Sequence, residues 1–175
     1  RPPDPAAVSK VYAVLAELCC VATQVKFVPG MDAFKIDEMP KKRAQNLLRS
    51  QLAIEYIVKL VEFVWVRYFK EDAELVKRSR DASGQWHGKW APINRMCQLA
   101  HNLLRLLVVG NRRCADTLQS IDAVEVLLKQ LPSGWNPPVI EVFDALMRRG
   151  EGGEEAGKQL YDGTRLVHRA SHAPP

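Results

Sequence analysis

The fold is decided by the stretch Pro40-Lys-Lys-Arg-Ala-Gln-Asn-Leu-Leu-Arg49-Ser-Gln-Leu-Ala-Ile-Glu55, whose apolar pattern continues to about Tyr68. Pro40 suits the first turn of a helix, where its missing N–H is not needed. Apolar residues then recur at three- and four-residue steps, namely Leu47, Leu48, Ile54, Ile57, Val61, Val64 and Tyr68. This spacing predicts one long amphipathic helix over 40–69. Lys42, Asn46 and Arg49 share another face, so the helix begins with a cationic stripe and ends as a core element.

Similar spacing predicts further helices on both sides of this element. Asp4-Pro5 is typical of a helix N-cap and first turn, and predicts a helix over about 5–23. A third helix is expected over 92–109, with Gly110 following it in the left-handed region. We also expect a short helix from Asn111, a helix over 121–131 with Ser120 as its N-cap, and a helix over about 138–149.

No window shows the period-two alternation of a strand, so the sequence predicts an all-α fold. Successive antiparallel helices favour an armadillo- or HEAT-like stack, although no fixed repeat period is visible. We expect one helical domain over 1–150 and a partly disordered C-terminal extension over 151–175. A long exposed loop is expected over 70–91, with Trp86 and Trp90 anchoring its C-terminal end.

Composition limits the classes of partner. The chain has 175 residues and a formal net charge of +5, which permits an anionic ligand. No Lys/Arg block dominates, and aromatic residues do not interleave the basic ones, so we expect no nucleic-acid binding. The most apolar window, 54–69, is interrupted by charged residues, and we expect no contact with a membrane. The chain begins at Arg1 without a signal peptide, and we expect it to be part of a longer protein.

The sequence contains no motif typical of catalysis. It lacks a glycine-rich phosphate loop, a His-Glu-x-x-His pair and a nucleophile elbow, so we expect neither enzymatic activity nor a cofactor. Cys19, Cys20, Cys97 and Cys114 lack the paired spacing of a zinc site and are expected to be buried, reduced thiols. His101 is expected to be a satisfied helix-face residue.

Two cationic clusters lie at expected helix starts: Lys41, Lys42, Arg43 and Arg49 form one, and Arg112 and Arg113 form the other. If successive helices are antiparallel, the segment after Gly110 begins at the same end of the domain as the helix over 40–69. Converging guanidinium forks, ammonium groups and helix N-termini would bind a compact, multiply phosphorylated anion. The alternative is two independent, solvated surface patches.

These residues also carry a resemblance to inositol trisphosphate receptors. Residues 40–51 resemble that family's Pro-x-Arg-x-Arg-Gln-Lys-Leu-Met-Arg-Glu-Gln segment without a gap. Leu103-Leu-Arg105 and Asn111-Arg112-Arg113 resemble its Val-Leu-Arg, followed at the same distance by Tyr-Arg-Lys. Val8-Ser-Lys also resembles the first helix of that family's domain. The resemblance covers about 5–150, is best over 40–58 and 93–118, and implies the armadillo-like RIH domain shared by ryanodine and inositol trisphosphate receptors.

The resemblance implies the helical half of a ligand-binding core for inositol 1,4,5-trisphosphate, with a neighbouring β-trefoil of the same parent chain as the other half. Lys42 and Arg49 match phosphate-contacting positions, and Arg112 and Arg113 match the Arg-Lys pair. Lys41, Arg43, Asn46 and Asn111 are auxiliary candidates. Asn46 stands where the family has a phosphate-binding Lys, and Asn111 stands where it has a Tyr.

The parent protein implied by the resemblance is a ligand-gated calcium-release channel. This domain would lie on the cytoplasmic face of the endoplasmic reticulum or of an acidic calcium store. Ryanodine receptors share the fold without this ligand, so the fold does not decide the function. The alternative is a helical-repeat scaffold, including a ryanodine-receptor-type domain, that binds a protein partner and no small ligand.

Overall fold

The computed structural model describes residues 4–68, 88–130 and 136–147, and every regular element within these ranges is helical. The predicted all-α fold is therefore confirmed. The expected extension over 151–175 and most of the expected loop over 70–91 lie outside the described residues.

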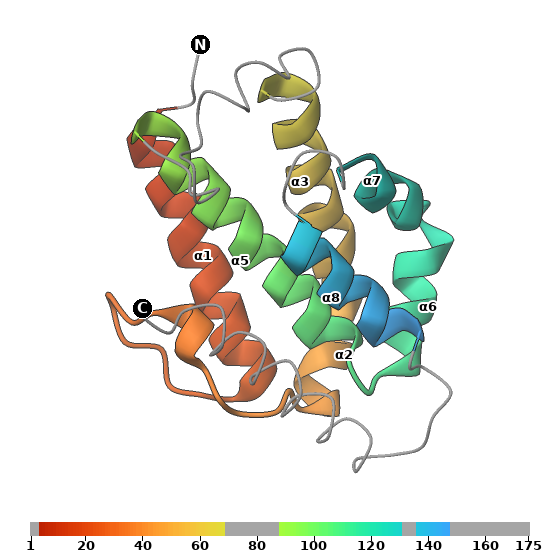
Figure 1. Cartoon of the computed structure of the whole chain (residues 1–175). Coiled ribbons are helices and arrows are strands. Elements are labelled where there is room, and N and C mark those ends of the chain that lie inside the picture. Colours follow the sequence, from red (N-terminus) through yellow and green to blue (C-terminus); the bar gives the residue numbers. More distant parts are fainter. Residues whose placement is uncertain (1–3, 69–87, 131–135, 148–175) are drawn as a thin grey trace, which may run out of the picture.

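The helices alternate in direction. Their order is α1 (Pro5–Thr23), η1 (Ala33–Lys35), α2 (Lys42–Ser50), α3 (Ala53–Tyr68), η2 (Gly88–Trp90), α5 (Ala91–Val108), α6 (Arg112–Ser120), α7 (Ala123–Gln130) and α8 (Asn136–Met147). In Figure 1, α1, α5 and α8 run downward, while α2–α3 and α6–α7 return upward. The antiparallel alternation expected from the sequence is thus present.

Helix α5 lies at the centre of the molecule. It packs against α1, α2, α3, α6 and α8, and its buried side chains include Leu99, Leu103, Leu104 and Leu107. Gly110 follows the helix at φ +64°, the left-handed conformation that was predicted. Removing one large apolar side chain from water stabilises a fold by about 1.5–3 kcal/mol, so the enclosure of α5 is a major source of stability.

The helix predicted over 40–69 is not continuous, because the chain breaks at Gln51 and Leu52, and Leu52 has φ +60°. The reason is the phase of the apolar stripe. The buried positions of α2 end at Leu48 and those of α3 begin at Ala53 and Ile54. A continuous helix of about 3.6 residues per turn would instead direct residues 51, 52 and 55 into the core. The break rotates α3 so that both stripes face α5.

The same break recurs later in the chain, between α6 and α7, where Asp122 has φ +54°. Residues 42–59 align without a gap with residues 112–129, and the pairs Leu48/Leu118, Ser50/Ser120, Ala53/Ala123, Glu55/Glu125 and Lys59/Lys129 are identical. The prediction that Ser120 caps the next helix is therefore wrong, because Ser120 closes α6 and α7 begins at Ala123. The repeated broken helix supports an armadillo-like stack, which stays a prediction.

The ends of other helices follow local signals. Asp4 Oδ1 accepts a hydrogen bond from Ala6 N at 3.1 Å, so Asp4 caps α1 as predicted. The loop expected to reach residue 91 ends earlier, because 88–90 form η2. Trp90 is buried and its ring centroid lies 6.2 Å from that of Tyr68, which confirms its expected anchoring role. Trp86 lies outside the described residues.

Helix α1 is apolar enough and long enough to cross a membrane by composition alone, with 19 residues and a mean hydropathy of 1.6. Among the described helices it is the one that meets this criterion. Its packing along α5 accounts for the same composition, because Leu15, Cys19 and Ala22 are buried in the shared core.

All four cysteines are buried and free. Burial raises the pKa of the Cys19 thiol to about 12 and that of Cys114 to about 11, and it raises the pKa of Cys97 further still. These thiols are therefore protonated at neutral pH and behave as small apolar side chains, which confirms their expected burial.

His101 is fully buried on α5. Its Nδ1 lies 2.7 Å from the Cys97 carbonyl oxygen and its Nε2 lies 3.1 Å from the Gln130 side-chain amide. A carbonyl oxygen can only accept, so Nδ1 carries the proton and donates to Cys97. The Gln130 atom placed beside Nε2 is Oε1, which also only accepts, so Nε2 accepts from Gln130 with the amide turned by 180°, which puts the NH₂ at this position. Burial lowers the pKa of His101 to about 4, so the ring is neutral and satisfied, as predicted.

The break at Leu52 can be tested by glycine substitution. Leu52→Gly should leave the free energy of unfolding unchanged or raise it by up to about 1 kcal/mol, because glycine removes the left-handed strain. Leu47→Gly is the matched control within α2 and should cost about 1 kcal/mol. Urea unfolding of both variants measures the difference. If Leu52→Gly costs as much as Leu47→Gly, α2 and α3 form one continuous helix.

His101 should make stability depend on pH. Its pKa is 6.5 when exposed and about 4 when folded, so between these values the unfolded chain binds a proton that the folded chain excludes. The free energy of unfolding should therefore fall by about 3 kcal/mol as the pH drops from 6.5 to 4.

Urea unfolding across this range measures the slope, and NMR of the imidazole C2 proton measures the pKa directly. The part of the pH dependence of the unfolding free energy that is due to His101 should be absent in His101→Gln. A resonance of His101 that titrates near 6.5 in the folded protein would contradict the burial.

Candidate anion-binding site

The two basic helix starts meet at the lower end of the molecule in Figure 1, where α2 packs against α6. The Asn111 side-chain amide donates to Asn46 Oδ1 at 3.2 Å and to Gln45 Oε1 at 3.1 Å. Asn46 and Asn111 are the two candidate ligand-binding positions that the sequence analysis singled out as differing from the motifs that the chain resembles. The structure joins them by a hydrogen bond, so the two departures form one contact.

Gln45 holds this junction together, and the sequence analysis did not single it out. Its side chain is buried, and its Nε2 donates to the carbonyl oxygens of Leu106 at 2.8 Å and Val109 at 2.9 Å. These are carbonyls at the end of α5, where intrahelical partners are lacking. The sequence could have indicated that Gln45 is buried, because it lies beside Ala44 and three residues before Leu48, on the buried side of α2.

Asn111 orients the start of α6. Its Oδ1 accepts from Cys114 N at 3.3 Å, which makes Asn111 the N-cap of α6, and the Cys114 thiol lies 3.7 Å from the Gln45 carbonyl oxygen. The side chain of Asn111 thus serves both the cap and the contact with α2. We call the surface formed by Lys42, Asn46, Arg49 and Asn111 the α2–α6 seam.

Arg49 lies half-buried at this seam. Arg49 follows Gln45 by about one turn, and the Gln45 carbonyl oxygen contacts the Cys114 thiol, so Arg49 lies near the start of α6. Its charge acts to lower the pKa of Cys114, against the larger effect of burial. The Arg49 Nε atom is buried without a hydrogen-bond partner. Lys42 is exposed one turn before Asn46, on the same side of α2. The seam therefore combines two cations with two side-chain amides.

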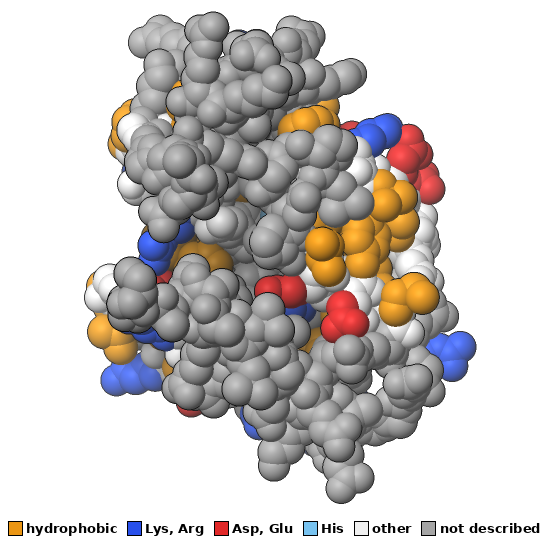
Figure 2. All heavy atoms as spheres, viewed as in Figure 1, with side chains coloured by type: hydrophobic (Ala, Val, Ile, Leu, Met, Phe, Trp, Pro, Cys, Tyr) orange, Lys and Arg blue, Asp and Glu red, His pale blue; other side chains and the backbone are white. Residues whose placement is uncertain are grey.

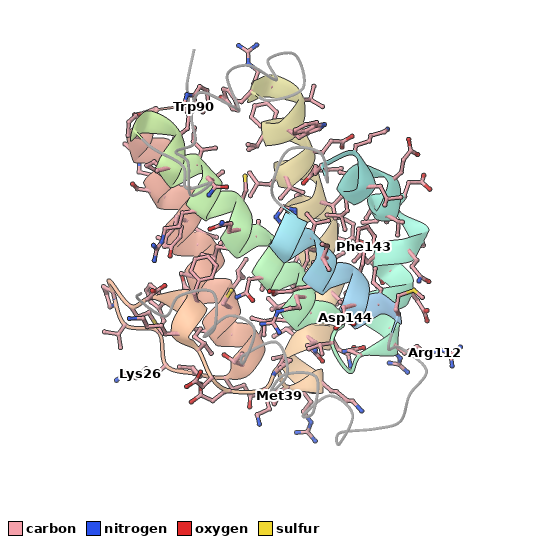
Figure 3. All side chains as sticks on the ribbon, viewed as in Figure 1. Lys26, Met39, Trp90, Arg112, Phe143 and Asp144 are labelled. Atoms are coloured by element: carbon pink, nitrogen blue, oxygen red, sulfur yellow. The ribbon has the colours of Figure 1, made fainter. Side chains whose placement is uncertain are left out.

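The remaining predicted cations are exposed, and Arg112 is directed away from the seam. Arg112 has 77% of its side chain exposed and lies 3.9 Å from Asp116; Figure 3 shows it at the outer edge, directed away from α2. Arg113 is exposed on the next position of α6, about 100° around the helix. Arg43 precedes the exposed Leu47 by one turn, on the outward side of α2. Lys41 is exposed, and its backbone N–H donates to Ala22 O at 2.9 Å.

The basic side chains at this end of the molecule are therefore spread over more than one face. On the face shown in Figure 2, the visible Lys and Arg side chains are separated from one another. Arg105, which carries part of the family resemblance, lies 3.5 Å from Glu141 of α8 and donates to Asn102. It links α5 to α8 and has a structural role. The seam is thus the part of the predicted site that the structure assembles.

Within the described ranges, no group of three or more His, Cys, Asp or Glu residues is arranged to hold a metal ion. Comparison of the chain with protein-family models, with curated proteins and with solved structures found no match. The geometry of the seam is therefore the basis for a functional proposal.

The hydrogen bond between Asn46 and Asn111 can be measured by a double-mutant cycle. Asn111→Ala should cost about 2–3 kcal/mol of unfolding free energy, because it removes both a helix cap and the amide contacts. Asn46→Ala should cost about 1 kcal/mol. The double variant should cost less than the sum by about 0.5–1 kcal/mol. Additive costs in urea unfolding would mean that the two side chains do not interact.

Proposed function

We propose that the α2–α6 seam binds a compact, multiply phosphorylated anion. The observation that carries the proposal is Arg49, whose buried Nε lacks a hydrogen-bond partner beside the start of α6. A half-buried guanidinium is held in place by its surroundings and loses little side-chain freedom when a phosphate binds. Its terminal nitrogens form a planar fork that matches two phosphate oxygens.

The neighbouring residues complement Arg49. Lys42 supplies a compact charge on the same side of α2. The half-buried Asn46 offers its amide NH₂ to ligand hydroxyls, while the buried Asn111 holds Asn46 in place through its own amide. The start of α6 adds the positive end of a helix dipole. Arg112 and Arg113 contribute mainly long-range attraction, because Arg112 is directed outward and paired with Asp116. These groups suit an inositol phosphate, which offers phosphates and hydroxyls on one ring.

In this proposal the chain is the helical half of the ligand-binding core of a calcium-release channel of the inositol trisphosphate receptor type. A β-trefoil of the parent chain would provide the other half, on the cytoplasmic face of an intracellular membrane. Inositol 1,4,5-trisphosphate would bridge the two halves and favour the closed arrangement. The support is the resemblance over 40–58 and 93–118, together with the juxtaposition of α2 and α6.

A helical-repeat scaffold that binds a protein partner is the second candidate function. It is favoured by large apolar side chains exposed on α1 and α3, including Val14, Tyr56 and Phe63. These side chains are not part of the α2–α6 seam, so the two functions are compatible.

Inositol 1,4,5-trisphosphate should bind this chain weakly and at the seam. We expect a dissociation constant in the millimolar range, because half of the ligand contacts are supplied here. Arg49→Ala should weaken binding by about tenfold to a hundredfold, which corresponds to one charge-assisted hydrogen-bonding group. Asn46→Lys should strengthen binding by adding a charge. Amide chemical shifts of α2 and α6, recorded at fixed ionic strength, measure these affinities.

Arg43→Ala is the matched control, because it removes the same charge from the outward side of α2. It should weaken binding by less than about threefold, through long-range attraction alone. Equal effects of Arg43→Ala and Arg49→Ala would show that the anion is attracted diffusely, and the proposed seam would then be rejected.

A further inference from the structure

A largely apolar groove lies between α1 and α3, with a cavity volume of about 450 Å³. Its lining includes Val14, Leu15, Leu48, Tyr56, Ile57 and Leu60. The rim is open to solvent, since 55% of Val14 and 64% of Tyr56 are exposed. The floor is already closed, because Leu15 and Ile57 are buried in the core of this chain. The fold is therefore complete without an occupant in the groove.

The repeated broken helix indicates what fits there. The groove is lined by α1, α2 and α3. We call α1–α3 the first unit and α5–α7 the second unit, because α2–α3 aligns with α6–α7 and each pair follows one long helix. All three helices of the second unit pack against α3. The groove on the first unit thus corresponds to the surface of the second unit against which α3 packs.

Individual residues agree with this correspondence. Leu48, Ala53 and Ile57 line the groove, and their aligned partners are Leu118, Ala123 and Leu127. All three partners are fully buried in the second unit, where α3 packs against α6 and α7. Tyr56 of the groove aligns with Val126, which is partly buried against the core. Leu48, Ala53 and Ile57 are themselves buried and form the floor of the groove, so the two units differ at the rim, where 64% of Tyr56 is exposed and its partner Val126 is partly buried.

We infer that the groove binds an amphipathic helix of another polypeptide, oriented in the same direction as α3. Such a helix would present branched aliphatic side chains in the manner of Ile54, Val58 and Val61, which form the buried face of α3. Because α3 runs opposite to α1, the C-terminal end of the bound helix would lie near Lys10, in the first half of α1. A cation there complements the negative end of a helix dipole and an acidic side chain.

The closed floor favours a separate partner, because the groove can be empty or filled without disturbing the core beneath it. This inference deepens the scaffold function and does not depend on anion binding, since the groove and the α2–α6 seam share no residue.

The probe for the experiment is a peptide with the sequence of α3. It carries Tyr56→Glu, Phe63→Glu and Val66→Lys, which replace apolar side chains that α3 exposes and so improve solubility. Fluorescence anisotropy of the labelled peptide, titrated with the full chain, should show saturable binding. A second peptide that also carries Val58→Pro should not bind, because it cannot form the helix.

Two valine variants of the protein provide the matched test. Val14→Asp should weaken peptide binding at least tenfold, because it places a charge in the groove. Val21→Asp is the control on the same helix, since Val21 is exposed but does not line the groove. It should leave the affinity unchanged. Both variants should bind inositol 1,4,5-trisphosphate like the parent chain, so failure of one function can be distinguished from failure of the other.

Three results would overturn the inference. The first is the absence of saturable binding by the peptide. The second is equal weakening by Val14→Asp and Val21→Asp, which would indicate non-specific adhesion. The third is a homodimer in sedimentation velocity that dissociates on Val14→Asp, because a second copy of this chain would then cover the groove.

Discussion

The enclosure of α5 is the constraint on which the rest of the structure depends. This helix has buried side chains around most of its circumference, so neighbours must cover it on several sides. Its C-terminal carbonyls also need donors, and the Gln45 amide supplies two of them, at Leu106 and Val109. An unsatisfied buried carbonyl would cost about 1–3 kcal/mol. The apolar surface of α5 and the polar end of α5 therefore both determine where α2 lies.

The placement of α2 has two consequences. The apolar stripes of α2 and α3 can face α5 together only if the chain breaks at Leu52, which adopts φ +60°. The placement of α2 also brings it beside the start of α6, where Asn46 contacts Asn111 and Arg49 lies near Cys114. The candidate anion-binding seam is thus a product of the same packing that stabilises the core.

The repeat links the seam to the groove. Each unit has a nine-residue helix, a two-residue break and a second helix that begins at alanine. In the second unit these elements lie against α3, and in the first unit the equivalent surface is open between α1 and α3. The units pack against each other at the seam through α2 and α6. The proposed anion site therefore lies between the two units, and the proposed helix-binding groove lies on the first unit.

The sequence by itself determined the all-α class, both ends of α1, the extent of α5 and the left-handed Gly110, because caps, proline and apolar spacing act within a few residues. It also led us to expect, as one of two alternatives, that the two basic helix starts converge at one end of the domain. The tertiary structure alone decided the break at Leu52, the role of Gln45 and the outward direction of Arg112. These features depend on which face each helix turns toward α5. The spacing of apolar residues within one helix does not specify that orientation.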